Sequence, residues 1–215
     1  LAAADKDQSP ESLGALITKM REAKRLRGTE LESFLAALRD LNEAIGPIIP
    51  TKVSPVVPGA DPLVDAIIEL ETFFNENTPA GVMYAIPAAS DYPGHVPEDA
   101  ERISKTFMID GTYHGWLEGR LAGGWAAKEM RPTGIYAAPG EVIRVTLPAK
   151  LAGEGFEVVI GSYNGGLKNR NEWHRYPDWQ VKVPVNSSTT EASNGLGGIV
   201  TIRVPREAND DQLKV

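Results

Sequence analysis

Five side chains suited to binding a sugar lie close together between residues 163 and 179. They are Tyr163, Trp173, His174, Tyr176 and Trp179. Aromatic rings stack on the apolar faces of sugars, and the asparagine, arginine and glycine residues around them supply hydrogen-bonding groups. One hypothesis is therefore a glycan-binding platform in a connection between two strands. The alternative is that the tryptophans cap a hydrophobic core, as buried aromatic residues commonly do.

Residues that could perform catalysis are few. The three histidines, His95, His114 and His174, are widely separated in the sequence. None belongs to a His-Glu-x-x-His motif, in which two histidines on one helical face bind zinc. The sequence has no cysteine, which excludes disulfide bonds, thiolate zinc sites and cysteine nucleophiles. We therefore expect no catalytic residue, no cofactor site and no metal site in this chain.

The second half of the chain has the pattern of β-strands. From about residue 100 apolar and polar residues alternate. Four strands are predicted, at residues 142–147, 156–160, 179–185 and 199–204. Gly134 and Gly140, each beside a threonine or a proline, predict tight turns. Residues 81–215 are therefore expected to form an antiparallel β-sandwich, entered through an extended lead-in at residues 81–104.

The first half has the pattern of helices. Leucine residues recur at helical spacing over residues 9–45, and Gly28 is expected to end the first of two helices in a hairpin. A third helix is predicted to begin at Asp61-Pro62. The proline-rich residues 47–60 between them fit a stiff connector, or alternatively a polyproline ligand. The predicted fold class is α+β, with a helical region at residues 1–80 ahead of the sandwich.

Composition and charge limit the classes of partner. Hydrophobic residues make up 42% of the chain and charged residues 24%, as in ordinary globular proteins. The net charge of -7 argues against nucleic acid or an anionic membrane as the main partner. No apolar run approaches the ~20 residues that a transmembrane helix needs. The chain begins with Leu1 followed by three alanines, which fits a processed exported protein or an expressed fragment.

An ordered series of segments in the second half carries a family resemblance. The segments are residues 92–97, Arg102-Ile103, Trp125, residues 132–143, residues 158–161, residues 175–177 and residues 197–202. Residues 132–143, PTGIYAAPGEVI, look like the TGLYAPPGE-x-I segment of the enhancin-like, mucin-degrading zinc metallopeptidases, which are gluzincins. Residues 197–202, GGIVTI, look like the GGLIYI strand before their peptidase domain. The resemblance covers roughly residues 90–205.

This resemblance implies that the sandwich is the N-terminal accessory region of a secreted or cell-envelope metallopeptidase that acts on glycoproteins such as mucins. The zinc of that family belongs to a peptidase domain, and its ligands match no residue here, so the catalytic domain is absent from this chain. The chain would then position or recruit substrate for a C-terminal catalytic domain in cis. Two alternatives remain: a stand-alone glycan-binding module, and a protein-interaction scaffold that docks through an exposed leucine stripe at residues 31–41.

Overall fold

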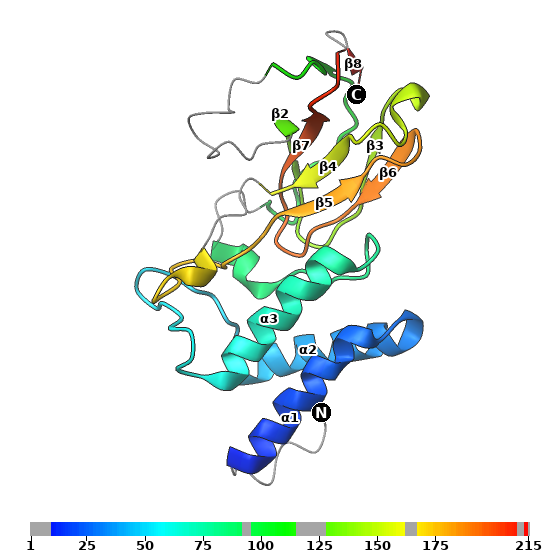
Figure 1. Ribbon diagram of the computed structural model, residues 1–215. Helices are drawn as coiled ribbons and strands as arrows, with labels where there is room; N and C mark the ends of the chain where they lie inside the picture. Colours follow the sequence, from blue (N-terminus) through cyan, green and yellow to red (C-terminus); the bar gives the residue numbers. More distant parts are fainter. Residues whose placement is uncertain (1–9, 92–95, 115–127, 162–166, 210–212, 215) are drawn as a thin grey trace.

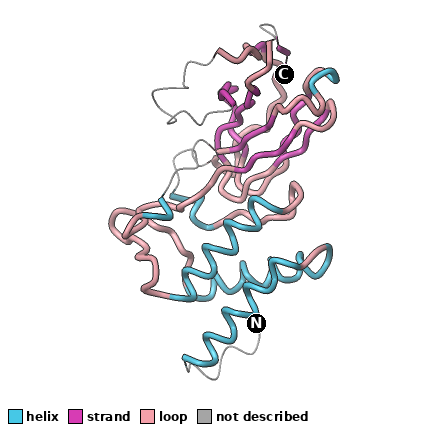
Figure 2. Tube along the Cα trace, in the orientation of Figure 1, coloured by secondary structure: helices cyan, strands magenta, loops and turns pink. Residues whose placement is uncertain are grey.

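The computed structural model describes residues 10–91, 96–114, 128–161, 167–209 and 213–214 (Figure 1). Three helices come first, and antiparallel sheets follow. The helices gather at one end of the molecule and the strands at the other (Figure 2). The predicted α+β class, with its helical region ahead of the strands, is confirmed.

The helices are α1 (Pro10–Glu22), α2 (Gly28–Ile45) and α3 (Pro62–Asn77), with the short turn η1 (Ala23–Arg25) after α1. Helix α3 begins as predicted, because the Asp61 carboxylate accepts hydrogen bonds from the amides of Leu63 and Val64 at 2.9 and 3.2 Å. The prediction for Gly28 was wrong. Its φ of 55° is a left-handed conformation open to glycine, and the residue starts α2 instead of ending α1.

The main sheet contains β2 (Lys128–Ala137), β7 (Gly198–Pro205), β4 (Glu157–Ile160) and β5 (Val181–Pro184), in that spatial order. Two smaller antiparallel pairs join β3 (Ile143–Thr146) to β6 (Thr189–Ala192), and β1 (Met108–Ile109) to β8 (Leu213–Lys214). Short turns lie at η2 (Pro87–Asp91), η3 (Ala149–Leu151) and η4 (Leu167–Asn169). The four predicted strands correspond to β3, β4, β5 and β7, whereas β1, β2, β6 and β8 were not predicted.

The longest strand, β2, contains one of the two expected turns. Its pairing with β7 shifts register between Pro132 and Tyr136, and Gly134 within that interval has a φ of 76°. Gly134 therefore forms a bulge inside a strand, which bends the strand without reversing it. Gly140, with a φ of 74°, does lie in the turn between β2 and β3, as predicted.

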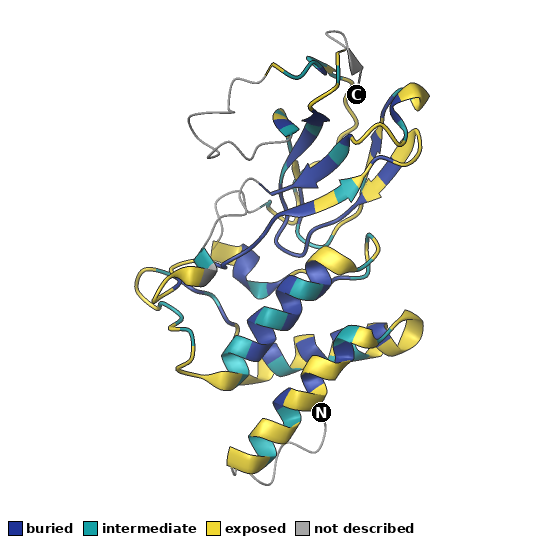
Figure 3. Ribbon diagram, viewed as in Figure 1, coloured by how far each residue is buried: buried dark blue, intermediate teal, exposed yellow. Residues whose placement is uncertain are grey.

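The chain has two hydrophobic cores. One lies between the main sheet and the β3–β6 pair and contains Val145, Val158, Ala192 and Ile202, as expected for a β-sandwich. The other lies beneath the helices (Figure 3, dark blue). It combines residues of α2 and α3 with Trp173, Tyr176, Trp179 and Leu196 from the second half of the chain. The helices are therefore packed on one end of the sandwich.

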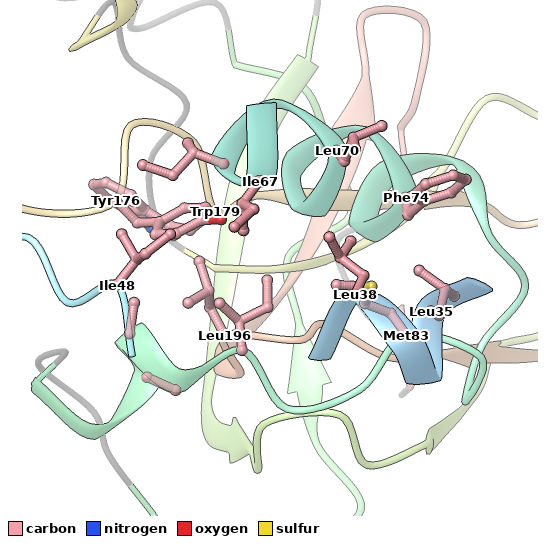
Figure 4. Close-up of a cluster of buried hydrophobic side chains, with 14 of the residues drawn as sticks. Leu35, Leu38, Ile48, Ile67, Leu70, Phe74, Met83, Tyr176, Trp179 and Leu196 are labelled. Atoms are coloured by element: carbon pink, nitrogen blue, oxygen red, sulfur yellow. The ribbon is translucent and has the colours of Figure 1, made fainter. Parts of the chain in front are cut away.

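Helix α2 turns its leucine stripe toward this second core. Leu31, Leu35 and Leu38 are all buried, and Figure 4 shows Leu35 and Leu38 facing Phe74 and Met83. The exposed stripe that a docking scaffold would require is thus absent from α2. None of the described helices is both long and apolar enough to span a membrane.

The proline-rich segment is fixed to the rest of the protein. Val56 and Trp173 exchange two backbone hydrogen bonds, of 3.0 and 2.7 Å. Ile48 is buried in the core beneath the helices, and the Asp65 carboxylate accepts a hydrogen bond from the Gly59 amide at 2.7 Å. The segment is anchored at several points along its length.

Candidate functional site

The predicted sugar-binding residues lie in different environments. Trp173, Tyr176 and Trp179 are 9%, 2% and 2% exposed, whereas His174 is exposed and Tyr163 lies outside the described residues. Stacking on a sugar requires an accessible ring face. The burial of these three rings therefore corrects the expectation of an open aromatic platform. They occupy the core, which is the alternative that the sequence left open.

Two of the rings also make contacts with polar groups of nearby residues in the same part of the chain. The indole Nε1 of Trp173 donates a hydrogen bond to the Leu167 carbonyl at 2.7 Å. The guanidinium of Arg175 lies 4.6 Å from the ring centre of Trp179, within the range of a cation–π contact. His174 points outward, where its Nε2 lies 2.7 Å from the Glu172 carboxylate. Within residues 172–175, Trp173 is therefore buried between exposed polar side chains, and residues 176–179 are all buried.

A buried carboxylate lies at the centre of the contact between helices and sandwich. Glu71, on α3, is fully buried and accepts hydrogen bonds from the hydroxyl of Tyr176, from the hydroxyl of Tyr84 at 2.6 Å and from the amide of Asn42 at 2.9 Å. Burial raises the pKa of Glu71 above its ordinary value, although all three hydrogen bonds act in the opposite direction. Burial also raises the pKa of both tyrosines, so each hydroxyl remains a donor.

A second polar contact, one turn further along α3, fixes the C-terminal end of this helix to the sheet. Asn75 donates to the Asn194 side-chain oxygen at 3.0 Å and accepts from the Gly195 amide at 2.7 Å. Asn194 in turn donates to the carbonyls of Ile160 and Trp179 at 3.0 and 2.6 Å. Both asparagines are buried. These bonds hold α3 against the ends of β4 and the strand that follows Trp179.

The positions of Glu71 and Asn75 in the sequence indicate that both are buried polar residues. Glu71 and Asn75 share a helical face with Ile67 and Phe74, because residues three and four apart are neighbours on a helix. A carboxylate and an amide on an apolar stripe must be hydrogen-bonded when that stripe is buried. Their partners, Tyr176 and Asn194, are more than 100 positions away, which no local pattern reveals.

An acidic cavity opens beside Trp173. It has a volume of about 440 Å³ and lies along one face of α3, between the proline-rich segment and the loop at residues 173–177. Its lining includes Asp65, Glu69, Thr72, Glu76, Trp173 and Pro177. Asp65 Oδ1 and Thr72 Oγ1 are buried oxygens without a protein hydrogen-bond partner. Such atoms call for a polar partner, because an unsatisfied buried oxygen costs about 1–3 kcal/mol.

A cluster of charged side chains around His114 lies at the end of the sandwich away from the helices. His114 Nε2 is 2.5 Å from the Asp110 carboxylate, and the pKa of Asp110 is lowered by this bond and by the Thr112 amide. The Glu129 carboxylate accepts from the His114 amide at 3.2 Å and from Arg131 at 2.7 Å. Neither this group nor any other group of three carboxylates and histidines among the described residues is placed to hold a metal ion. The cluster joins β1 to β2 through ion pairs and hydrogen bonds.

Comparison with protein families identifies the second half of the chain. A family described as the N-terminal domain of M60-like peptidases matches residues 99–215, which is more than half of the chain. The chain belongs to this family. The match covers β1 to β8 and begins after the three helices, so the M60-like N-terminal domain proper is the sandwich.

Curated relatives match a smaller part of the chain. TRPM8 channel-associated factor 3 from Mus musculus is 30% identical over 83 residues, which are 39% of this chain and 9% of the relative. The TRPM8 channel-associated factor homolog from Danio rerio is 23% identical over 88 residues, 41% of this chain and 10% of the relative. The chain thus spans about a tenth of the length of these relatives. No solved structure matches it.

The family match supports part of what the sequence resemblance implied. The family is described as the N-terminal domain of M60-like peptidases, and the matched residues include the segment at 132–143. Helices α1, α2 and α3 lie outside the matched range. They are nevertheless fixed to the M60-like domain by the core that contains Trp179 and by the hydrogen bonds of Glu71.

Proposed function

We propose that this chain is the non-catalytic accessory part of a secreted enhancin-like metallopeptidase and that it positions or recruits glycoprotein substrate. The observation that carries the proposal is the match of residues 99–215 to the N-terminal domain of M60-like peptidases. In this role the zinc and its ligands belong to a peptidase domain in cis. A glycoprotein held by the accessory part would raise the local substrate concentration at that peptidase domain.

The fixed position of α3 supports this proposal. The buried contacts of Glu71 with Tyr176, and of Asn75 with Asn194, hold α3 in one orientation on the sandwich. Groups on the exposed side of α3 therefore keep a constant geometry relative to the M60-like domain. A recognition site that is held rigidly loses less conformational entropy when it binds, which is an advantage for weak ligands such as glycans.

The acidic cavity beside Trp173 has the chemistry for such a ligand. The carboxylates of Asp65 and Glu76 accept hydrogen bonds, which sugar hydroxyls can donate. Apolar surface from Pro177 and from the edge of Trp173 forms part of the wall. Asp65 Oδ1, which lacks a protein partner, would gain a donor from a ligand hydroxyl after a small side-chain adjustment. We propose this cavity as the glycan contact of the accessory part.

A binding measurement tests the proposal. The chain is titrated with a panel of mucin-type glycopeptides by isothermal titration calorimetry, together with the double variant Thr72→Val and Glu76→Gln. Both changes keep the side-chain shape and remove a hydroxyl or a charge from the cavity. We expect the wild-type chain to bind at least one glycopeptide, and the double variant to bind it at least tenfold more weakly.

The matched control is Glu11→Gln, an exposed glutamate on α1 outside the cavity lining. It should bind as the wild type does. Equal affinity of all three proteins would remove the cavity from the proposal. Absence of binding by the wild type to every glycopeptide, together with unchanged cleavage of glycoprotein by an M60-like peptidase from which this chain has been deleted, would contradict substrate recruitment altogether.

A second candidate function rests on the curated relatives. Their names describe them as TRPM8 channel-associated factors, so they are named for association with a protein and not for catalysis. By analogy we propose protein binding without peptidase activity as the alternative role of the sandwich. A pull-down with the 215-residue chain as bait separates the two roles, because a partner retained after enzymatic deglycosylation is recognised as a protein and not through its glycans.

A further inference from the structure

A groove runs across the open side of the sandwich, away from the acidic cavity. It has a volume of about 640 Å³ and lies between the extended residues 101–107 and strands β2 and β3. Three of its lining side chains are large, apolar and exposed: Ile103 at 59%, Tyr136 at 49% and Val142 at 44%. A cluster of exposed apolar side chains around a concave surface is typical of a binding site for another polypeptide.

One border of this groove is an extended segment that lies outside the strands. Residues 101–107 form no backbone–backbone hydrogen bond with any of the residues that the structure describes. The segment is held instead by the ion pair of Arg102 with Glu141, whose nitrogen–oxygen distances are 2.5 and 2.8 Å. Arg102 and Glu141 neutralise each other, and Glu101, Lys105 and Arg144 add charges of both signs to the lining beside the exposed apolar side chains. That combination suits a polypeptide and does not suit a strongly charged ligand.

The residues that line the groove are also those that relate the chain to its family. Segments 102–103 and 132–143 carried the resemblance to the enhancin-like peptidases, and both form walls of the groove. Almost all of the lining lies within residues 99–215, the range that matches the M60-like N-terminal domain. Tyr136 and Val142 are exposed, so the sandwich core does not require them.

The end of the chain lies beside the groove. Strand β8 pairs with β1, with Met108 opposite Lys214 and Ile109 opposite Leu213. Met108 directly follows the segment at 101–107 that borders the groove and is itself 57% exposed. A domain that follows this one in a longer polypeptide would therefore begin at the end of the groove that Phe107 forms.

Pairing between two copies of this chain is a weaker alternative. The free edge of β2 contains Pro132, which has no amide to donate, and the bulge at Gly134. Both features hinder the addition of a strand at a sheet edge. A side-by-side contact that fills the groove with side chains fits the surface better than an extended sheet does.

We infer that this groove is the docking surface for the M60-like peptidase domain in cis. The inference rests on the proposed function, and it adds the surface through which the accessory part is joined to the catalytic part. The groove residues would form the centre of an interface, and a stable interface of this kind needs about 800 Å² from each side. Docking there leaves the acidic cavity on α3 free for substrate.

Hydrogen–deuterium exchange tests the inference. Exchange is compared between the 215-residue chain and a longer polypeptide in which this chain is followed by its M60-like peptidase domain. Amides of residues 101–107, which form no backbone hydrogen bond with another described residue, are expected to exchange at least tenfold more slowly in the longer polypeptide. Residues 51–57, which include the 95% exposed Val53, serve as the internal control and should not change.

Matched variants locate the contact. Val142→Asp places a charge in the groove, and Val53→Asp makes the same change at an exposed valine of the proline-rich segment. In the longer polypeptide, Val142→Asp should restore fast exchange at residues 101–107, whereas Val53→Asp should leave the protection intact. Tyr136→Ser is the second groove variant if Val142→Asp impairs folding, as judged by the circular dichroism of the short chain.

Three results would overturn the inference. They are equal exchange of residues 101–107 in both polypeptides, protection that survives both groove variants, and protection that appears in the short chain as its concentration rises. The third result would assign the groove to a second copy. Cleavage of glycoprotein by the longer polypeptide is measured in parallel. Protection without cleavage would refute the proposed function and support the docking surface. Cleavage without protection would support the proposed function and refute the docking surface.

Discussion

Tyr176 donates a buried hydrogen bond to Glu71, a residue 105 positions earlier in the chain. One partner belongs to the β-rich half and the other to α3, so a single bond joins the regions that the sequence presents as separate. Tyr84 and Asn42 bind the same carboxylate. Glu71 thereby connects two helices, the segment after α3 and the aromatic loop of the sandwich.

This contact predicts a pH dependence of stability. Burial raises the pKa of Glu71 above its ordinary value of 4.5. Below pH 4.5 the carboxyl group is neutral in both states, and its contribution to stability is fully present. As the pH rises, the unfolded chain ionises first, so stability is lost until the pH passes the pKa of the folded state. Glu71→Gln cannot ionise and should lose less stability than the wild type over this range.

Urea unfolding at pH values from about 4.5 to 8 measures this difference. The control is Glu11→Gln, at an exposed residue of α1. Its free energy of unfolding, plotted against pH, should run parallel to that of the wild type. A curve for Glu71→Gln that is also parallel to the wild type would mean that Glu71 keeps one protonation state throughout.

Asn194 should be among the most sensitive polar residues. Its side chain bonds the Ile160 and Trp179 carbonyls, the Leu196 amide and the Asn75 side chain. Asn194→Ala leaves these buried groups without partners, so we expect a loss of at least about 3 kcal/mol in the free energy of unfolding. Chemical denaturation measures it. Asn186→Ala, at an exposed asparagine, should change stability by less than about 0.5 kcal/mol.

Two glycines with similar backbone angles should respond differently to alanine. Gly161 has a φ of 97°, and a Cβ there would lie 2.3 Å from the Trp179 carbonyl oxygen. Gly134 has a φ of 76° with open space around it. Gly134→Ala should therefore cost only the backbone strain of about 1–2 kcal/mol. Gly161→Ala adds a steric clash with backbone and should cost clearly more in thermal unfolding. Equal losses would show that the Trp179 segment can move away.

Substitutions of Trp179 and His174 test whether the first lies in the core and the second on the surface. Trp179→Ala removes a ring that is 2% exposed and should cost about 3–5 kcal/mol. His174→Ala alters an exposed side chain and should stay within about 0.5 kcal/mol. Equilibrium unfolding gives both values. A folded Trp179→Ala variant of nearly wild-type stability would contradict the placement of this ring in the core.

Local patterns predicted much of the fold. Helix α3 was located from Asp61-Pro62 and its apolar spacing, because a helix start depends on residues within one turn. Strands β3, β4, β5 and β7 were located from alternation for the same reason. Strand β2 was missed because a Pro-Thr-Gly sequence reads as a turn. Its bulge is recognisable only when β7 is seen to pair on both sides of Gly134.

The candidate site could be predicted less well, because it depends on contacts between distant segments. The aromatic residues at 173–179 were found, but sequence alone did not decide between a sugar platform and a core. That decision depends on α3 and Ile48 lying over Tyr176 and Trp179 (Figure 4). The cavity beside Trp173 was not predicted, because α3, residue Pro58 and the loop near Pro177 meet there only in the folded chain.

The shared core under the helices has a consequence for folding during synthesis on the ribosome. Helix α3 ends at Asn77, yet its buried face is completed by Trp173, Tyr176, Trp179 and Leu196. During synthesis α1, α2 and α3 therefore emerge about a hundred residues before the side chains that cover them. Until those side chains have been synthesised, the apolar face of the nascent helices stays uncovered. Chaperone binding therefore matters most during this part of synthesis.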